Sequence, residues 1–356
     1  MQNAPVKEAI LEEIANLIDT GRFTNGPAVE AFEGAFAAYC DVEHCVGVAS
    51  GLDGLRLALV ALGLEPGDEV IVPAQTFVAT LEAVTQAGGL PVPVEISRDD
   101  YCMDVDAFLS AVGDRTRFVM PVHLYGQVAH MTAIGEVAAA KRLTVVEDAC
   151  QAHGASRAGY TPGRDHAAAF SFYPGKNLGA FGDAGAVTLT DADAARRVRA
   201  LREHGQMAKY EHAMEGWTSR LDTIQAIVLE AKLPFLDSWN GERRRAAAHY
   251  SEMLAGVGDL QLPNVPADSQ PVWHIYVVRT ADPSGLAAHL SANGIGTGRH
   301  YPFPPHLSPA YAYLGYANGA FPVAEALARE GLSLPMFPGI TEAQLAHVVT
   351  AIQDFF

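Results

Sequence analysis

Seven short apolar runs, spaced over the first half of the chain, are the feature that most limits its possible folds. The runs are Cys45–Ala49, Glu69–Val72, Pro91–Ile96, Arg117–Pro121, Leu143–Glu147, Ala169–Phe172 and Ala186–Thr190. Amphipathic stretches that indicate helices accompany them at Gly54–Leu62, Phe77–Ala87, Met131–Lys141 and Ala192–His204. This alternation predicts an α/β fold whose mostly parallel sheet is covered on both faces. Ligand sites in such sheets lie beyond the carboxyl ends of the strands.

The pattern changes after Arg220. The elements predicted there are helices at Leu221–Leu233, Leu236–Leu254 and Pro283–Asn293, a strand at Val272–Arg279, an aromatic, proline-rich stretch at Tyr301–Tyr316, and a last helix from Thr341. A chain of 356 residues also exceeds the size at which a single core stops growing. We therefore expect a large domain over residues 1–235 and a smaller α+β domain over 236–356.

Charge and composition restrict the class of partner. The chain has 41 acidic and 24 basic residues, giving a net charge of -17. Nucleic acids and anionic membranes are therefore not expected as partners, since both require basic patches. No apolar run approaches the ~20 residues that cross a bilayer, and the N-terminus lacks a leader pattern, so we expect a cytoplasmic protein. The four cysteines have no Cys-x-x-Cys spacing, which favours reduced, buried thiols.

The segment Ser171–Gly179 places Lys176 at the expected ligand edge, just before a glycine-rich stretch. A phosphate-binding P-loop requires a glycine at position 170 and Ser or Thr after the lysine, whereas this chain has Phe170 and Asn177. A Schiff-base lysine is the other chemistry, because partial desolvation helps to keep an amine unprotonated and nucleophilic. On spacing alone, an ordinary surface lysine is an equal alternative.

Glu147-Asp148 ends an apolar run at the same edge. A carboxylate there suits a metal ligand, a base, or the partner of a ring cation, which is what pyridoxal phosphate needs. No cluster with ligand spacing accompanies Asp148, which disfavours a metal. A capping acid is the structural alternative.

Two further segments fit a flat, phosphorylated cofactor. Ser50-Gly51-Leu52 stands between a strand and a helix, where small residues let backbone N–H groups approach a phosphate. Phe77 opens the next helix and either stacks on a ring or packs in the core.

These segments, in this order, resemble the sugar aminotransferases typified by the DegT, DnrJ, EryC1 and StrS proteins. The matching segments are Gly26–Glu33, Gly67–Pro73, Val122–Gln127, Glu147–Ala155, Ser219–Asp222, Gln225–Ala226 and Leu332–Pro335. The resemblance covers nearly the whole chain. It implies a fold-type-I, pyridoxal-phosphate-dependent transferase with a seven-stranded sheet in its large domain, usually a homodimer with active sites at the subunit interface.

The resemblance also implies individual roles. Around the cofactor it places Lys176 as the Schiff-base lysine, Asp148 at the pyridine nitrogen, Gln151 at the ring hydroxyl, Phe77 against the ring, and Ser171 with the amides of Gly51 and Leu52 at the phosphate. Arg22 and Thr24, within Arg22–Gly26, and the pair His300-Tyr301 resemble parts of the family that line the sugar-nucleotide site. No metal is implied.

The reaction implied is transfer of an amino group from L-glutamate to a nucleotide-linked keto sugar, and the chain length and the segment His123–Gln127 favour a 3-keto sugar. The free Lys176 amine moves a proton between the donor Cα and the cofactor in both half-reactions, so no second base is required. His123 and His153 lie near this edge in sequence, and a structural role for each is as open as a catalytic one.

Two positions depart from the family pattern. Family members commonly have Thr where this chain has Leu52, and Asn where it has Thr218, and both family residues are associated with the cofactor phosphate, the Asn from the partner subunit. A charge-assisted hydrogen bond contributes about 1.5–3 kcal/mol. We therefore expect the cofactor to bind less tightly here than in typical relatives.

Three other functions remain open at this stage. One is amination of a keto cyclitol by the same mechanism. A second is a non-catalytic regulator on a retired aminotransferase fold, which the phosphate-site departures favour and the joint presence of Lys176, Asp148 and Gln151 disfavours. A nicotinamide-dependent dehydrogenase is the third, and it is disfavoured because this chain has no Gly-x-Gly-x-x-Gly after its first strand.

Overall fold

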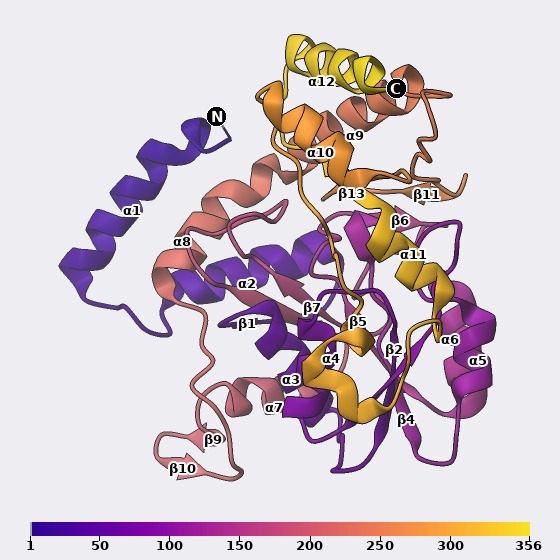
Figure 1. Cartoon of the computed structure of the whole chain (residues 1–356). Coiled ribbons are helices and arrows are strands. Elements are labelled where there is room, and N and C mark those ends of the chain that lie inside the picture. The colour runs from indigo at the N-terminus through magenta and orange to yellow at the C-terminus, as the bar shows by residue number, and fades with distance from the viewer. Residues whose placement is uncertain (1) are drawn as a thin grey trace.

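The computed structural model describes residues 2–356, which build a seven-stranded sheet between two layers of helices, with further helices gathered towards the C-terminus (Figure 1). The sheet has the order β1-β8-β7-β5-β4-β2-β3. Its strands are β1 (His44–Val48), β2 (Glu69–Pro73), β3 (Leu90–Val94), β4 (Thr116–Val119), β5 (Thr144–Asp148), β7 (Ala167–Ser171) and β8 (Gly185–Leu189). All seven predicted strands are thus confirmed, and the sheet is mostly parallel because only β8 runs against its neighbours.

Helices cover both faces of the sheet. One face carries α3 (Gly51–Ala61), α4 (Ala79–Gln86) and α7 (Ala192–Leu201). The other carries α2 (Pro27–Cys40), α5 (Val105–Ala111), α6 (Met131–Lys141) and α8 (Thr223–Lys232), with α1 (Lys7–Thr20) against α8. The side chains of β7 alternate accordingly, since Ala169 packs under α3 whereas Phe170 packs under α2.

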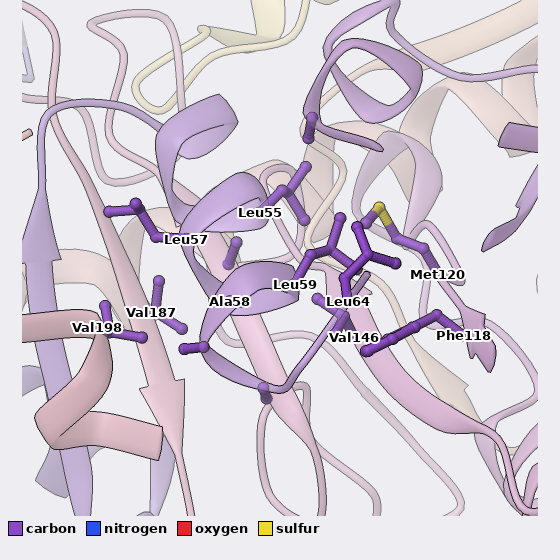
Figure 2. Close-up of a cluster of buried hydrophobic side chains, with 14 of the residues drawn as sticks. Leu55, Leu57, Ala58, Leu59, Leu64, Phe118, Met120, Val146, Val187 and Val198 are labelled. Atoms are coloured by element: carbon purple, nitrogen blue, oxygen red, sulfur yellow. The ribbon is translucent and has the colours of Figure 1, made fainter. Parts of the chain in front are cut away.

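The cluster under α3 is the largest apolar core of the molecule. Leu55 and Leu59 point from α3 towards Val146 and Phe118 of the sheet, and Val198 of α7 closes the cluster beside Val187 (Figure 2). Burial of each such side chain stabilises the fold by about 1.5–3 kcal/mol. This packing fixes α3 over the sheet, and therefore fixes where its N-terminus lies at the carboxyl edge of the strands.

The C-terminal part has a core of its own. Helices α9 (Leu236–Met253), α10 (Pro283–Ala292) and α12 (Glu342–Phe355) pack against the antiparallel pair β12 (Tyr276–Arg279) and β13 (Gly331–Leu334). α11 (Pro322–Glu330) joins this part to the end of the large sheet through a mixed apolar cluster. Two short antiparallel pairs lie outside these sheets: β6 (Ser156–Arg157) with β11 (Ser269–Gln270), and β9 (Gln206–Ala208) with β10 (Glu211–His212). The boundary between residues 235 and 236 stays a prediction.

One predicted element is shorter than expected. The strand predicted at Val272–Arg279 is confirmed only from Tyr276. The backbone of Val272 and Ile275 instead donates to the carbonyls of Gly126 and Tyr125, so this segment bonds to the large sheet's loops before it joins β13. Among residues 2–356, no helix combines the length and apolarity needed to span a bilayer.

We predict that Phe36→Ala destabilises the fold by about 3–5 kcal/mol. Phe36 is completely buried, and its ring packs edge-to-face against Phe170 and Phe172, with centroids 5.1 Å away in both cases. Urea unfolding measures the change. Phe303→Ala is the control because that ring is 74% exposed and should change the free energy of unfolding little; equal effects of the two variants would contradict this picture of the core.

Candidate active site

A cavity of about 670 Å³ opens at the carboxyl edge of the sheet, where the C-terminal part faces the ends of β1, β5 and β7. Nine of the residues predicted for the site line it: Gly51, Leu52, Phe77, Asp148, Gln151, Ser171, Lys176, His300 and Tyr301. The fold therefore brings together side chains that are up to 250 positions apart in the sequence.

The N-terminus of α3 forms one wall of the cavity. The Ser50 side chain caps the helix by accepting a hydrogen bond from the amide of Asp53 at 3.1 Å. Gly51 is required by space, because a Cβ there would lie 2.6 Å from the sulfur of Cys150 and 2.7 Å from the Cβ of Ser171. The first N–H groups of a helix have no partner within the helix, so those of Gly51 and Leu52, together with the Ser171 hydroxyl, form a donor set suited to an anion.

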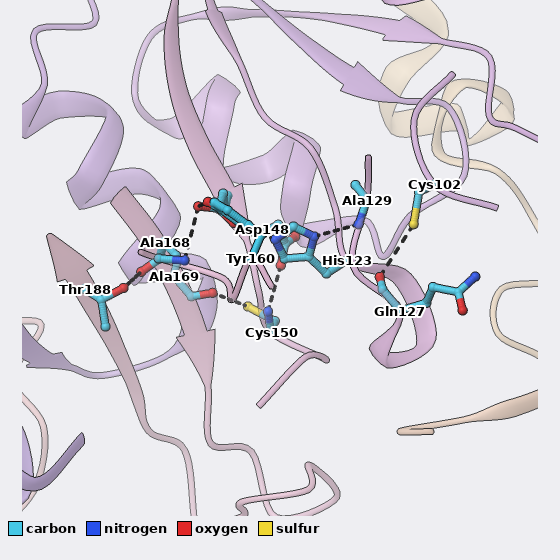
Figure 3. Close-up of polar contacts among 12 residues, drawn as sticks. Cys102, His123, Gln127, Ala129, Asp148, Cys150, Tyr160, Ala168, Ala169 and Thr188 are labelled. Atoms are coloured by element: carbon cyan, nitrogen blue, oxygen red, sulfur yellow. Dashed lines mark hydrogen bonds and ion pairs between the residues drawn. The ribbon is translucent and has the colours of Figure 1, made fainter. Parts of the chain in front are cut away.

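Asp148 ends β5 as a buried carboxylate held by two donors. Its Oδ2 accepts a hydrogen bond from Thr80 at 2.7 Å. Its Oδ1 accepts from the amide of Cys150 at 3.2 Å, as Figure 3 shows. Thr76 lies 2.7 Å from Thr80, hydroxyl to hydroxyl. Because the Thr80 proton is used on Asp148, Thr76 must be the donor in that pair. The relay fixes the carboxylate as an acceptor at the floor of the cavity.

Lys176 follows the end of β7 and also reaches the cavity. Burial lowers the pKa of its amine below the ordinary lysine value, although the Asp148 carboxylate acts in the opposite direction. Within residues 2–356, its Nζ makes no hydrogen bond. Lys176 is therefore an amine that is free to react.

Gln151 and Tyr301 line the cavity as a hydrogen-bonded pair. The amide of Tyr125 donates to Gln151 Oε1 at 2.6 Å, which turns Gln151 Nε2 towards the hydroxyl of Tyr301, 3.1 Å away. The ring of Phe77 lies 5.2 Å from that of Tyr301, centroid to centroid, and is half exposed. Phe77 was predicted to open a helix, but α4 begins only at Ala79; the intervening turn is what directs the ring into the cavity instead of the core.

His123 and His153 lie outside the cavity. His123 is fully buried, donates to Glu147 at 2.7 Å and accepts from the amide of Ala129 at 3.2 Å (Figure 3). His153 is also fully buried, between the rings of Phe170 and Phe172, and burial lowers its pKa to about 3. Neither ring lines the cavity.

Three predicted residues do not line the cavity of their own chain: Arg22, Thr24 and Thr218. All three are exposed. Thr218 instead pairs with His204 Nε2 at 3.1 Å, beside the hairpin of β9 and β10. Their predicted roles stay predictions.

The sequence analysis did not single out Thr76, His274 and Ser333, which line the cavity, or Thr80, which donates to Asp148 from behind it. His274 carried no sequence signal, since its place depends on how the C-terminal part packs on the sheet.

The donor set fits pyridoxal phosphate. The free N–H groups at the start of α3 and a hydroxyl suit its phosphate, a buried carboxylate suits its ring nitrogen, and a desolvated amine suits its aldehyde. The glycine at position 51 lets the start of α3 pack closely against Cys150 and Ser171, which brings its amides next to the Ser171 hydroxyl. Among residues 2–356 no group of three or more His, Cys, Asp or Glu side chains is arranged to hold a metal.

Comparison with known proteins gives one consistent result. Residues 5–353 match the DegT/DnrJ/EryC1/StrS aminotransferase family. The chain is 49% identical, over 96% of its length and 90% of the relative, to dTDP-3-amino-3,4,6-trideoxy-α-D-glucose transaminase of Streptomyces venezuelae. It is 43% identical, over 98% and 94%, to a UDP-N-acetyl-3-dehydro-α-D-glucosamine 3-aminotransferase of Acidithiobacillus ferrooxidans. The crystal structure of S. venezuelae DesV in complex with a ketimine intermediate superposes with a TM-score of 0.96 at 48% identity, covering 99% of this chain and 94% of that one.

We predict that the Lys176 amine titrates below the ordinary lysine value of about 10.4. Burial disfavours the ammonium form, so the proton leaves at a lower pH than from an exposed lysine. Reductive ¹³C-methylation followed by an NMR pH titration measures the midpoint, and Lys176→Ala identifies the signal by removing it. A midpoint at or above the ordinary value would contradict the desolvated environment described here.

Proposed function

The chain belongs to the DegT/DnrJ/EryC1/StrS aminotransferase family, and we propose that it transfers an amino group from L-glutamate to a nucleotide-linked 3-keto sugar with pyridoxal 5′-phosphate as cofactor. The observation that carries the proposal is the presence, in one cavity, of the unpaired Lys176 amine and the buried Asp148 carboxylate. The names of the two relatives, both of which concern amino groups at sugar carbon 3, support the acceptor class.

Different residues of the cavity are assigned to the phosphate and to the ring of the cofactor. We assign its phosphate to the amides of Gly51 and Leu52 and to the Ser171 hydroxyl, which meet at the start of α3. Asp148 pairs with the ring nitrogen, and Phe77 packs on the ring. When bound, the cofactor supplies an electrophilic carbon for the amino group and a protonated ring that withdraws electrons.

Gln151 is oriented before any ligand arrives. Because its Oε1 is occupied by the Tyr125 amide, its Nε2 is the atom left for the cavity. One Nε2 proton goes to the Tyr301 hydroxyl and the other is available for the ring hydroxyl of the cofactor.

Lys176 carries the proton transfers. Its lowered pKa increases the fraction of free amine near neutral pH, so it can take a proton from the Cα of the amino donor and return it at the next step. The Thr76–Thr80 relay keeps Asp148 an acceptor throughout, because both of its oxygens already face donors.

We propose a homodimer in which Arg22, Thr24 and Thr218 reach the cavity of a second copy. Their absence from the cavity of their own chain supports this arrangement. His300 and Tyr301, which do line that cavity, then meet the sugar from the same subunit that supplies Lys176. We also propose a cytoplasmic location, since four cysteines that form no disulfide suit a reducing compartment.

The proposed function predicts a specific spectroscopic sequence. Added pyridoxal phosphate should give a visible absorbance band that bleaches with L-glutamate and returns on addition of a nucleotide-linked 3-keto sugar. Lys176→Ala should abolish the band, with the melting temperature as a check on folding. A band that ignores L-glutamate would refute the donor, and a band that survives in Lys176→Ala would refute the role of the lysine.

A further prediction concerns position 218, where this chain has Thr and the family commonly has Asn. Thr218→Asn should raise the affinity for pyridoxal phosphate about tenfold or more, because the longer amide arm restores a donor to the phosphate. Titration of apo-protein, followed by the quenching of tryptophan fluorescence, gives the dissociation constant. Thr218→Ala is the matched control and should show no gain. If the asparagine variant binds no more tightly than wild type, Thr218 has no part in the phosphate site.

A further inference from the structure

Asn177, the neighbour of Lys176, has an amide whose orientation is fixed by its surroundings. It is buried, and its Nδ2 lies 2.9 Å from the backbone oxygen of Val272 and 2.8 Å from Oδ1 of Asn240. A carbonyl oxygen can only accept, so the atom facing Val272 must be the nitrogen. Both amide protons are then used, and Oδ1 is left as an acceptor.

That acceptor determines the protonation of His274. Asn177 Oδ1 lies 3.2 Å from Nδ1 of His274, and because the amide oxygen has no proton to give, Nδ1 must carry one. Burial, and after it the positive charge of Lys176, lowers the pKa of His274 well below the ordinary histidine value. At neutral pH the ring therefore holds a single proton, on Nδ1.

The other ring nitrogen is available to the cavity. His274 lines the cavity together with Lys176, His300 and Ser333. His300 is already engaged through its Nδ1 with the Ser333 hydroxyl at 2.8 Å. Within residues 2–356, Nε2 of His274 has no hydrogen-bond partner, so the ring turns one nitrogen to the buried amide and leaves the other with a free lone pair.

We propose that His274 Nε2 is a substrate-reading atom: it accepts a hydrogen bond from an amino or hydroxyl group of the substrate. The proposal rests on the aminotransferase function proposed above. It adds a residue that selects substrates with a hydrogen-bond donor group facing Nε2. A site built to accept a hydrogen bond discriminates strongly against ligands that lack the donor, because its own polar atom is then left buried and unpaired.

The tautomer can be tested without any substrate. In ¹⁵N-detected histidine spectra of the full-length protein loaded with pyridoxal phosphate at pH 7, the His274 signals, identified by their loss in His274→Asn, should show the Nδ1–H form. A proton on Nε2, or on both nitrogens, would overturn the proposal.

Two variants separate substrate reading from a purely structural role. In His274→Asn the side-chain amide can occupy the place of Nδ1 and still donate to Asn177, whereas the atom corresponding to Nε2 is gone. His274→Phe removes both. We expect both variants to raise the substrate concentration for half-maximal bleaching about tenfold, with unchanged affinity for pyridoxal phosphate; rescue by asparagine to the wild-type value would overturn the proposal in favour of a structural contact.

The choice of probe identifies the donor group. L-glutamate and dTDP-3-amino-3,4,6-trideoxy-α-D-glucose each carry an amino group, and only the second carries a sugar hydroxyl. Weakening of both would assign Nε2 to the shared amino group, and weakening of the nucleotide sugar alone would assign it to the sugar hydroxyl. If neither probe bleaches the wild-type protein, the proposed function fails, and the NMR result alone decides whether Nε2 is an acceptor.

Discussion

Two adjacent carboxylates are buried in this molecule, and the need to supply both with hydrogen-bond donors determines the arrangement of much of it. Glu147 and Asp148 are consecutive in β5, so they face opposite sides of the sheet. Glu147 is satisfied by His123, the Tyr160 hydroxyl and the amide of Gly163. Asp148 is satisfied only in part by protein donors, namely Thr80 of α4 and the amide of Cys150 in the turn after β5. The first carboxylate fastens the loops on one face, and the second keeps lone pairs for a ligand on the other.

Sequence reasoning recovered the features that depend on local pattern. The seven strands of the sheet are read from apolar runs, and the placement of Lys176 and Asp148 at the cavity follows from their positions after such runs, whereas their roles stay predictions. It missed α2, although Pro27 at the helix start and the buried pair Phe32 and Phe36 carried a readable signal. It could not find His274, because that ring reaches the cavity only when the chain near Val272 bonds to the loop at Gly126. This pairing joins positions nearly 150 residues apart, and no periodic pattern in the sequence indicates it.

The same long-range pairing explains how the lysine and the C-terminal part are coupled. Asn177 links the loop after Lys176 to Val272, His274 and Asn240 through a single buried amide. Asn240 in turn donates to the backbone of His153 behind the sheet. Because every proton in this chain of amides has one possible direction, a shift of the C-terminal part would break several hydrogen bonds together. One hydrogen-bond network therefore sets both the position of the Lys176 amine and the packing of the C-terminal part beside it.

A lowered pKa by itself does not identify the reactive lysine. Burial also lowers the pKa of Lys232, to about 8, and that residue is even less exposed to solvent than Lys176. Its amine, however, donates to the carbonyl of Gly179 at 2.6 Å and lies over the ring of Phe181, outside the cavity. Desolvation makes both amines more nucleophilic, but only Lys176 combines an unpaired Nζ with space for an electrophile and with a carboxylate across the same cavity. Geometry, more than acidity, therefore supports the role proposed for Lys176.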